Sequence, residues 1–145
     1  MVQLKPVTKE NLEEVLSLAV NDDQQGFVSS TAVSLAQAYV CPGTAFPFAV
    51  CSGRDVVGFI MMGYYEKKKY YTLWKLLIDR NHQRKGYGRQ ALKQGVAFLQ
   101  ERFHVTEIFT GVSPGNTVAK KLYRSVGFVN TGVTENNMEE LYLKC

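Results

Sequence analysis

Residues 79–92 read "DRNHQRKGYGRQAL" and connect an apolar, strand-like run to an amphipathic helix. Where that helix should begin, two glycines stand among three cations: Arg84, Lys85, Gly86, Gly88 and Arg89. Glycine loses more backbone entropy on folding than any other residue, and clustered cations repel one another. A partner from outside the chain would compensate for both effects, and an anion is the partner that such a turn favours.

A strand that enters a helix through a glycine-bearing turn points successive backbone N–H groups at one place, where the helix dipole adds positive potential. Without a Cβ at Gly86 and Gly88, the backbone can approach a phosphate closely. The turn lacks the Gly-Lys-Ser/Thr of a Walker loop, and the acidic residue of a dinucleotide fingerprint does not follow at the right strand end. The residues alone leave two interpretations equally open: a pyrophosphate cradle, or a solvated basic loop with a tight turn.

The chain has 145 residues, of which 46% are hydrophobic and 21% charged, so we expect one globular domain over residues 1–145 and exclude a disordered protein. No apolar run approaches the roughly 18 residues of a membrane span, and the segment "MVQLKPVTKENLEEVL" has no signal-peptide core. Cys41, Cys51 and Cys145 show no CxxC spacing, which favours free thiols over disulfides or a zinc site. We therefore expect a cytoplasmic protein with no membrane partner.

Charge is unevenly distributed along the chain, whose formal net charge is +4. Between Glu66 and Arg124, thirteen Lys and Arg residues oppose four acids, whereas the rest of the chain has four against nine. A basic middle with acidic flanks suits a protein that holds an anion in one part and attracts a cation in another. The basic middle also supports a nucleic-acid binder, but its aromatic residues are not interleaved with the cations as in RNA-binding motifs. We therefore expect no nucleic-acid partner.

Hydrophobic periodicity and turn residues predict a mixed sheet with helices on its faces, in the order β-α-α-β-β-β-α-β-α-β-β. The predicted strands cover residues 2–7, 46–52, 56–65, 70–79, 105–112, 128–133 and 138–145. The predicted helices are one capped by Thr8, with Leu12, Val15, Leu16 and Ala19 on its apolar face, and three over residues 29–39, 88–103 and 117–126. On the helix over 88–103, one face should be buried: Ala91, Leu92, Gly95, Val96 and Leu99.

Two motifs carry a resemblance to a known family. Residues 83–88, Gln-Arg-Lys-Gly-Tyr-Gly, follow the strand "LWKLLID" and resemble the Q/R-x-x-G-x-G/A signature of the GNAT superfamily of N-acetyltransferases. Residues 112–128, "VSPGNTVAKKLYRSVGF", are similar to its second hallmark, in which an Asn opens a short helix, a Tyr follows about two turns later and Gly-Phe ends the helix. Residues 21–39, "NDDQQGFVSSTAVSLAQAY", and the strands after them resemble the bacterial diamine and polyamine acetyltransferase subgroup.

The resemblance implies an α/β (α+β) single-domain GNAT fold: a mostly antiparallel, twisted mixed sheet of six to seven strands, about four helices, and a splay between the fourth and fifth strands. Acetyl-CoA would be the co-substrate, with no metal. Backbone N–H groups of the turn would hold its pyrophosphate, and a main-chain N–H near Leu76 or Ile78 would polarise the thioester carbonyl. The implied cofactor-binding residues are Leu76, Ile78, Gln83, Arg84, Lys85, Gly86, Tyr87, Gly88, Arg89 and Asn116.

The resemblance also implies catalytic roles. Tyr123 would be the general acid that protonates the departing thiolate, and Ile78 the main-chain oxyanion contact; core packing is the alternative for Tyr123. Mammalian-type polyamine acetyltransferases carry two adjacent acids where this chain has Trp74 and Lys75, so the base has no match there. Glu66, at a strand end, is the candidate general base, and its alternative is an ion pair with the lysines at 67–69.

Further residues have two interpretations each. We expect Trp74 first in the core, and second as an aromatic wall that stacks on an aliphatic ammonium. Asp22 and Asp23 either attract a cationic substrate or form a solvated helix end. Four tyrosines either line a substrate groove or cover two strand ends: Tyr64, Tyr65, Tyr70 and Tyr71. His82 and His104 have no partner at metal-ligand spacing, so we expect no metal site.

Together these features predict an acetyl-CoA-dependent N-acetyltransferase that moves an acetyl group directly to a primary amine, which the subgroup resemblance implies to be a diamine or polyamine such as spermidine or spermine. The cysteines are not placed with a histidine as a nucleophile, so no covalent enzyme intermediate is expected. The alternatives are an acetyltransferase for another amine, such as a protein N-terminus or an aminoglycoside, and a catalytically silent module that binds CoA or senses polyamines. The resemblance leaves a homodimer open.

Overall fold

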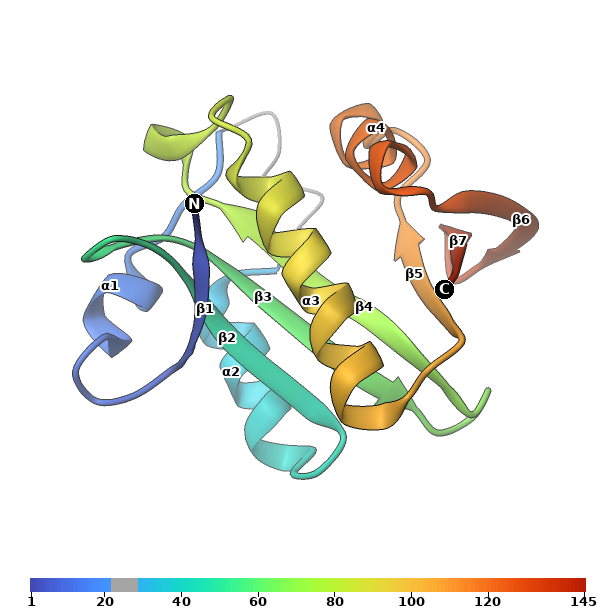
Figure 1. Cartoon of the computed structure of the whole chain (residues 1–145), viewed down its shortest axis with the longest axis horizontal. Coiled ribbons are helices and arrows are strands. Elements are labelled where there is room, and N and C mark those ends of the chain that lie inside the picture. Colours follow the sequence, from blue (N-terminus) through green and yellow to red (C-terminus); the bar gives the residue numbers. More distant parts are fainter. Residues whose placement is uncertain (22–28) are drawn as a thin grey trace.

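The computed structural model describes residues 1–21 and 29–145, so Asp22 and Asp23 lie outside the described residues. Strands and helices follow one another in the predicted order (Figure 1). The strands are β1 (Gln3–Pro6), β2 (Ala45–Ser52), β3 (Asp55–Tyr65), β4 (Tyr70–Ile78), β5 (Glu107–Val112), β6 (Val129–Glu135) and β7 (Met138–Lys144). The helices are α1 (Leu12–Leu16), α2 (Thr31–Val40), α3 (Tyr87–Phe103) and α4 (Thr117–Val126), and a short 3₁₀ helix, η2 (Arg80–His82), precedes α3.

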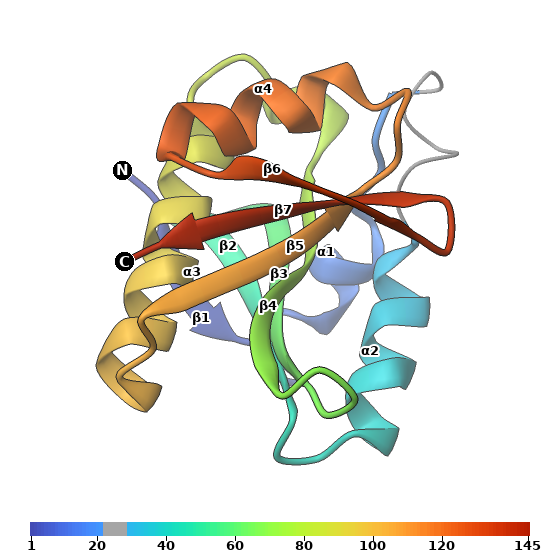
Figure 2. The ribbon, with the colours of Figure 1, turned by 90° about the vertical axis from the view of Figure 1, so that its right-hand side faces the viewer.

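Within the described residues, seven strands form one sheet in the order β1-β2-β3-β4-β5-β7-β6. Neighbouring strands are antiparallel except β4 and β5, which are parallel and are connected through α3. Helices α3 and α4 pack on one face of the sheet and α1 and α2 on the other (Figure 1, Figure 2). The predicted mixed, mostly antiparallel sheet with helices on its faces is confirmed.

Strands β4 and β5 separate soon after they meet. They pair at Thr72 with Phe109 and at Leu73 with Thr110, and beyond these two pairs they diverge (Figure 1). On its other side, β4 stays paired with β3 as far as Ile78. The predicted splay between the fourth and fifth strands is therefore confirmed, and half of β4 has a free edge toward β5.

A register shift in β4 marks the start of the splay. Met62 of β3 is opposite Leu73, but the preceding Met61 is opposite Lys75, so Trp74 is an extra residue in β4. A β-bulge of this kind bends its strand and increases the local twist. The bulge thus lies one residue beyond the last pair that joins β4 to β5, where β4 turns away.

Helix α3 packs on the sheet through the five residues predicted for its buried face: Ala91, Leu92, Gly95, Val96 and Leu99. Its close approach to β3 is at Gly95, where an added Cβ would lie 2.9 Å from Ile60 Cδ1 and 3.1 Å from Met62 Sδ. The absence of a side chain at Gly95 therefore lets the helix sit close to the sheet. This packing fixes the N-terminus of α3 beside the splay.

The first helix differs from its prediction. Helix α1 begins at Leu12, because Asn11 Oδ1 accepts a 2.8 Å hydrogen bond from Thr8 N–H and so builds a turn where the Thr8 cap was expected. The helix also ends before Ala19, whose N–H donates to Asp79 Oδ1 at 3.0 Å. A tertiary hydrogen bond to the end of β4 thus replaces the last predicted turn of helix.

The three cysteines are free thiols, with Cys51 buried and Cys145 exposed. Among residues 1–21 and 29–145, no three His, Cys, Asp or Glu side chains gather as metal ligands. The helices in that part of the chain are too short or too polar to cross a membrane.

Candidate active site

The turn that follows β4 is tied to the N-terminal segment of the chain. Asp79 is buried, and its carboxylate oxygens accept hydrogen bonds from the N–H groups of Ala19 at 3.0 Å and Asn81 at 3.1 Å. Gln83 Nε2 donates to the main-chain carbonyl of Ile78 at 3.0 Å. These bonds fix the path of the chain between the end of β4 and the start of α3.

The N-terminus of α3 is open. Gly86 is its N-cap, with a φ of +81° that side-chain-bearing residues rarely adopt, and no side chain in the described part of the chain caps it. By contrast, α4 is capped by Asn116, whose Oδ1 accepts from Ala119 N–H at 3.2 Å. The first amides of a helix have no partner within it. Those of α3, a helix of 17 residues, therefore form a site suited to an anion.

A cavity of about 430 Å³, which we call the loop cavity, opens at these amides. It is lined by most of the residues expected to bind the cofactor: Leu76, Ile78, Gln83, Arg84, Gly86, Tyr87, Gly88, Arg89 and Asn116. Lys85 is not among its lining residues. Helix α4 adds an apolar wall from Val118, Ala119 and Leu122. The loop cavity is thus basic at one end and apolar along its side, which suits an elongated ligand with an anionic end.

The free edge of β4 faces this cavity. Asp79 N–H donates to the carbonyl of Val57 in β3 at 2.8 Å. Because alternate residues of an antiparallel strand direct their N–H groups to the same side, those of Leu76 and Ile78 point away from β3, toward the side that β5 has left. An extended ligand arm can pair with β4 there as an added strand does.

Tyr123 lies where β4 and β5 part. Its ring packs edge-on against Phe128, with ring centroids 5.3 Å apart, and its side chain is hydrogen-bonded with Thr110. Burial raises the pKa of Tyr123 above its usual value, and the hydrogen bond with Thr110 opposes part of that rise. Only 7% of the residue is exposed. It nevertheless lines the loop cavity and a second one of about 170 Å³, the fork cavity, so core packing and a place in the cleft coexist.

The fork cavity also contains Trp74 and Lys75. Lys75 Nζ donates to Ser29 Oγ at 2.8 Å and lies 5.9 Å from the centroid of the Trp74 ring; partial burial lowers the pKa of Lys75. The prediction that places Trp74 first in the core is wrong, because 36% of it is exposed. Trp74 is the extra residue of the bulge, so the regular alternation of inward and outward side chains in β4 is interrupted there. Its ring lines the fork cavity and the cavity described next.

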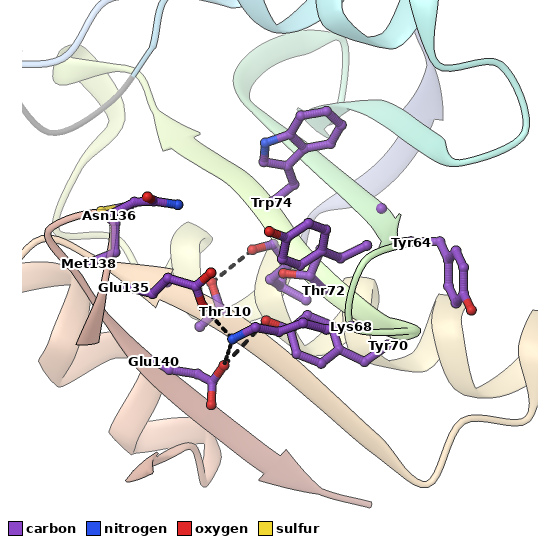
Figure 3. A pocket seen from close by; sticks show the side chains of 14 residues that line it. Tyr64, Lys68, Tyr70, Thr72, Trp74, Thr110, Glu135, Asn136, Met138 and Glu140 are labelled. Atoms are coloured by element: carbon purple, nitrogen blue, oxygen red, sulfur yellow. Dashed lines mark hydrogen bonds and ion pairs between the residues drawn. The ribbon is translucent and has the colours of Figure 1, made fainter. Parts of the chain in front are cut away.

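A third cavity, of about 350 Å³, lies between the β3–β4 hairpin and the β6–β7 hairpin (Figure 3). We call it the acidic cavity, because Glu135 and Glu140 contribute carboxylates to it. Lys68 Nζ lies 2.5 Å from Glu135 Oε2 and 3.3 Å from Glu140 Oε2, and both contacts raise the pKa of Lys68. The Tyr70 hydroxyl donates to the same oxygen of Glu140 at 3.3 Å. One ammonium group is therefore held by two carboxylates within an aromatic pocket.

The three cavities adjoin one another through shared walls. Trp74, Gly111 and Met138 line both the acidic and the fork cavities. Asn116 and Tyr123 line both the fork and the loop cavities. The open N-terminus of α3 and the acidic cavity thus lie at opposite ends of one series of pockets, with Tyr123 between them.

Glu66 is not brought to this series of pockets. It is exposed in the turn between β3 and β4 and lines none of the three cavities. The alternative for Glu66 was an ion pair with the lysines at 67–69, but Lys68 pairs with Glu135 and Glu140 instead. The placement speaks against Glu66 as a general base, since a base must reach the proton that it removes.

The four tyrosines divide into two groups. Tyr70 stacks on Phe109 with ring centroids 4.1 Å apart and an interplanar angle of 13°, and Tyr65 contacts Tyr70 edge-on at 5.7 Å. Tyr71 instead stacks on Phe103 at the end of α3. Alternation along β4 explains the division, because neighbouring residues face opposite sides of the sheet. Tyr65 and Tyr70 line the acidic cavity, and Tyr71 packs in the helix-covered core. Tyr64 lines the acidic cavity and also contacts Tyr71, with ring centroids 4.9 Å apart.

Three residues on this side of the site were not predicted from the sequence. Glu135 and Glu140 lie in "TENNMEE", residues 134–140, a segment noted only as part of an acidic flank. Thr110 lies in the last pair that joins β4 to β5, and no feature of the sequence distinguishes it from other threonines in strands. The acidic C-terminal turn was the signal that could have indicated a cation site.

Comparisons with known proteins agree with this geometry. Residues 12–128 match the acetyltransferase (GNAT) family. Over 99% of its length, the chain is 31% identical to the spermine/spermidine N(1)-acetyltransferase of Bacillus subtilis (strain 168), of which it covers 97%.

Two solved structures have a similar fold. One is an acetyltransferase from Thermus thermophilus, with a TM-score of 0.78 and 24% identity over 100% of this chain and 97% of that one. The other is the spermidine N-acetyltransferase from Vibrio cholerae in complex with CoA and spermine, with a TM-score of 0.79 and 16% identity over 99% and 95%. At these identities the likeness shows the fold.

Proposed function

This chain belongs to the acetyltransferase (GNAT) family and is an N-acetyltransferase that uses acetyl-CoA, and we propose that its acceptor is a primary amine of a diamine or polyamine. The family resemblance of residues 83–88 and 112–128 is thereby confirmed. One observation carries the proposal: the acidic cavity, lined by two carboxylates and several aromatic rings, adjoins the pocket of Tyr123. The 31% identity to a spermine/spermidine N(1)-acetyltransferase supports it.

The loop cavity fits the donor. Main-chain N–H groups at the start of α3 would hold the pyrophosphate, with Arg84 and Arg89 beside them. Arg89 is oriented by a 3.3 Å hydrogen bond from its Nη2 to the carbonyl of Ser125. Because Oδ1 of Asn116 is used in capping α4, its Nδ2 is the group that would contact the pantetheine arm. The apolar side of the cavity would exclude water from that arm.

When bound, acetyl-CoA supplies an activated acetyl group as a thioester. The N–H groups of Leu76 and Ile78 would donate to the carbonyl oxygen as it gains negative charge. As the carbon–nitrogen bond forms and the carbon–sulfur bond breaks, Tyr123 would transfer its Oη proton to the sulfur, and the proton released by the amine nitrogen would restore the phenol. Its raised pKa keeps that proton in place at neutral pH. Glu66 has no part in the proposal, because it lies outside the pockets.

Amine acetylation by the purified protein tests this proposal. Acetyl-CoA would be mixed with spermidine, spermine, putrescine, an N-terminal peptide amine or an aminoglycoside, with release of the free thiol followed by absorbance and the product by mass spectrometry. We expect the polyamines to have the highest kcat/KM. Preferred acetylation of the peptide or the aminoglycoside would overturn the substrate class. Binding of CoA and polyamine without thiol release would instead indicate a sensing module.

A further inference from the structure

We propose that Lys68 occupies the subsite in which this enzyme binds the remote ammonium group of its amine substrate, and that the substrate displaces Lys68 when it binds. The inference rests on the proposed function and adds to it a subsite and an internal competitor. Figure 3 shows the arrangement: the Lys68 side chain enters the acidic cavity and ends between Glu135 and Glu140.

The chemistry of Lys68 is that of a substrate end. Its side chain is a chain of four methylenes with a terminal primary ammonium, which is also the structure of the aminobutyl arm of spermidine. In the acidic cavity this ammonium contacts Glu135 Oε2 at 2.5 Å and Glu140 Oε2 at 3.3 Å. The site therefore already holds a group of the type that a diamine or polyamine would present.

The subsite does not depend on Lys68 for its shape. Glu140 Oε1 accepts from the Thr131 hydroxyl at 3.0 Å, and Glu140 Oε2 accepts from the Tyr70 hydroxyl at 3.3 Å. Tyr70 is itself fixed by stacking on Phe109, with centroids 4.1 Å apart. The side chain of Glu140 is only 15% exposed. A carboxylate held in this way keeps its position when the ammonium leaves, and its charge then needs a new cation.

Lys68 itself is easily displaced. It lies in the exposed turn between β3 and β4, and a third of its side chain, 33%, is exposed. Its other partner, Glu135, has 47% of its side chain exposed. Ion pairs with this exposure stabilise a fold little, because solvent screens them. A substrate ammonium can take the place of Lys68 Nζ while the hairpin stays folded.

The position of the subsite requires a substrate with two amines. Trp74, Gly111 and Met138 form the wall between the acidic cavity and the fork cavity, which Tyr123 lines. A molecule with one ammonium at Glu140 would extend its other amine past Trp74 into the fork cavity, toward Tyr123. The aromatic rings of Trp74 and Tyr70 suit the methylenes and the cations of such a chain. A monoamine can reach only one of the two positions.

Spermidine and N-butyl-1,3-diaminopropane, which lacks only the amino group at the end of the butyl arm, form a matched substrate pair. Kinetics with both would be measured for the wild-type protein, Lys68→Met and Glu140→Gln, with Lys67→Met as the control in the same turn. We expect Lys68→Met to lower KM for spermidine about three- to tenfold, because the competitor is gone, with kcat unchanged. Glu140→Gln should raise that KM about tenfold or more. Neither variant should change KM for the analogue, and Lys67→Met should change neither value.

An unchanged KM for spermidine in Lys68→Met would overturn the displacement, and an equal effect of Glu140→Gln on both compounds would overturn the remote subsite. Calorimetric titration of spermidine into the CoA-bound protein separates these failures from that of the proposed function. Tighter binding to Lys68→Met, together with no acetylation of any amine by the wild type, would keep the subsite and reject the acetylation of polyamines. Thermal unfolding of each variant confirms that it is folded.

Discussion

Thr110 Oγ1 donates a 2.8 Å hydrogen bond to the main-chain carbonyl of Leu73, across the last register pair that joins β4 to β5. Thr110 is buried and is also hydrogen-bonded with Tyr123. A side chain of β5 thus closes the paired part of the two strands and positions the residue beyond it. The same Thr110 hydroxyl therefore contacts both the carbonyl at the point where β4 and β5 separate and the phenol of Tyr123.

Thr110→Val should therefore affect stability and catalysis together. Valine keeps the shape but leaves a buried carbonyl without its donor, so we expect the free energy of unfolding to fall by about 1–3 kcal/mol and kcat to fall more than CoA affinity. Urea unfolding and steady-state kinetics measure both. Thr106→Val, at an exposed position in the approach to β5, is the control and should change neither. Wild-type kcat in Thr110→Val would show that Tyr123 does not need this partner.

Tyr123→Phe should lower kcat about ten- to a thousandfold and leave CoA affinity nearly unchanged, because only the proton donor is removed. Burial raises the pKa of Tyr123 above 10.0, so the proton stays on the hydroxyl throughout the neutral range and is lost only at higher pH. The kcat profile of the wild type should accordingly show no decline due to Tyr123 below about pH 10. Tyr39→Phe, at a position that is 85% exposed, is the matched control. Full activity of Tyr123→Phe would remove this residue from the mechanism.

Gly86→Val should abolish CoA binding, because the side chain enters the space in front of the α3 amides. The substitution also strains the backbone, since φ is +81° at this position. Gly43→Val is a control for strain alone: its φ is +85° and an added Cβ meets nothing within 4 Å. Both variants should lose about 1–2 kcal/mol of stability, but only Gly86→Val should lose binding in a calorimetric titration with CoA. Retained binding would reject the cradle.

Lys75→Met should change how stability depends on pH. Burial lowers the pKa of Lys75 in the folded chain below the 10.5 of the unfolded chain. Between those two pKa values the unfolded chain binds more protons than the folded chain, so the stability of the wild type rises with pH in that range. At pH values below both, Lys75 is charged in both states and its full desolvation penalty remains. We expect the stability of the wild type relative to Lys75→Met to increase as pH approaches 10.5. Urea unfolding at several pH values measures this difference, and a difference that does not vary with pH would contradict it.

The predicted elements that proved correct depend on residues close together in the chain. The buried face of α3 follows from apolar residues spaced at helical intervals between Ala91 and Leu99. The turn before α3 follows from the special backbone freedom of Gly86. The Thr8 cap failed for the opposite reason, because Asn11 competes for the same turn and Asp79, far along the chain, binds the segment that should have continued the helix.

The acidic cavity had no comparable local pattern. Lys68 meets Glu135 and Glu140 only because β7 lies between β5 and β6, which brings the C-terminal hairpin across from the β3–β4 turn. Trp74 faces the cavities rather than the core because one extra residue in β4 changes its register with β3. A shift of one residue reverses the side to which a strand residue points, and apolar composition does not show where such a shift occurs.

The sequence by itself determined the family, the order of the elements and the glycine turn that opens α3, because helical periodicity, glycine geometry and motif spacing act over a few residues. The tertiary structure alone decided the point near Thr110 where β4 and β5 separate, the outward position of Trp74 and the ion pairs of Lys68 with Glu135 and Glu140. These features arise from strand order and register, which depend on the sum of many contacts between distant segments rather than on the preference of any one of them.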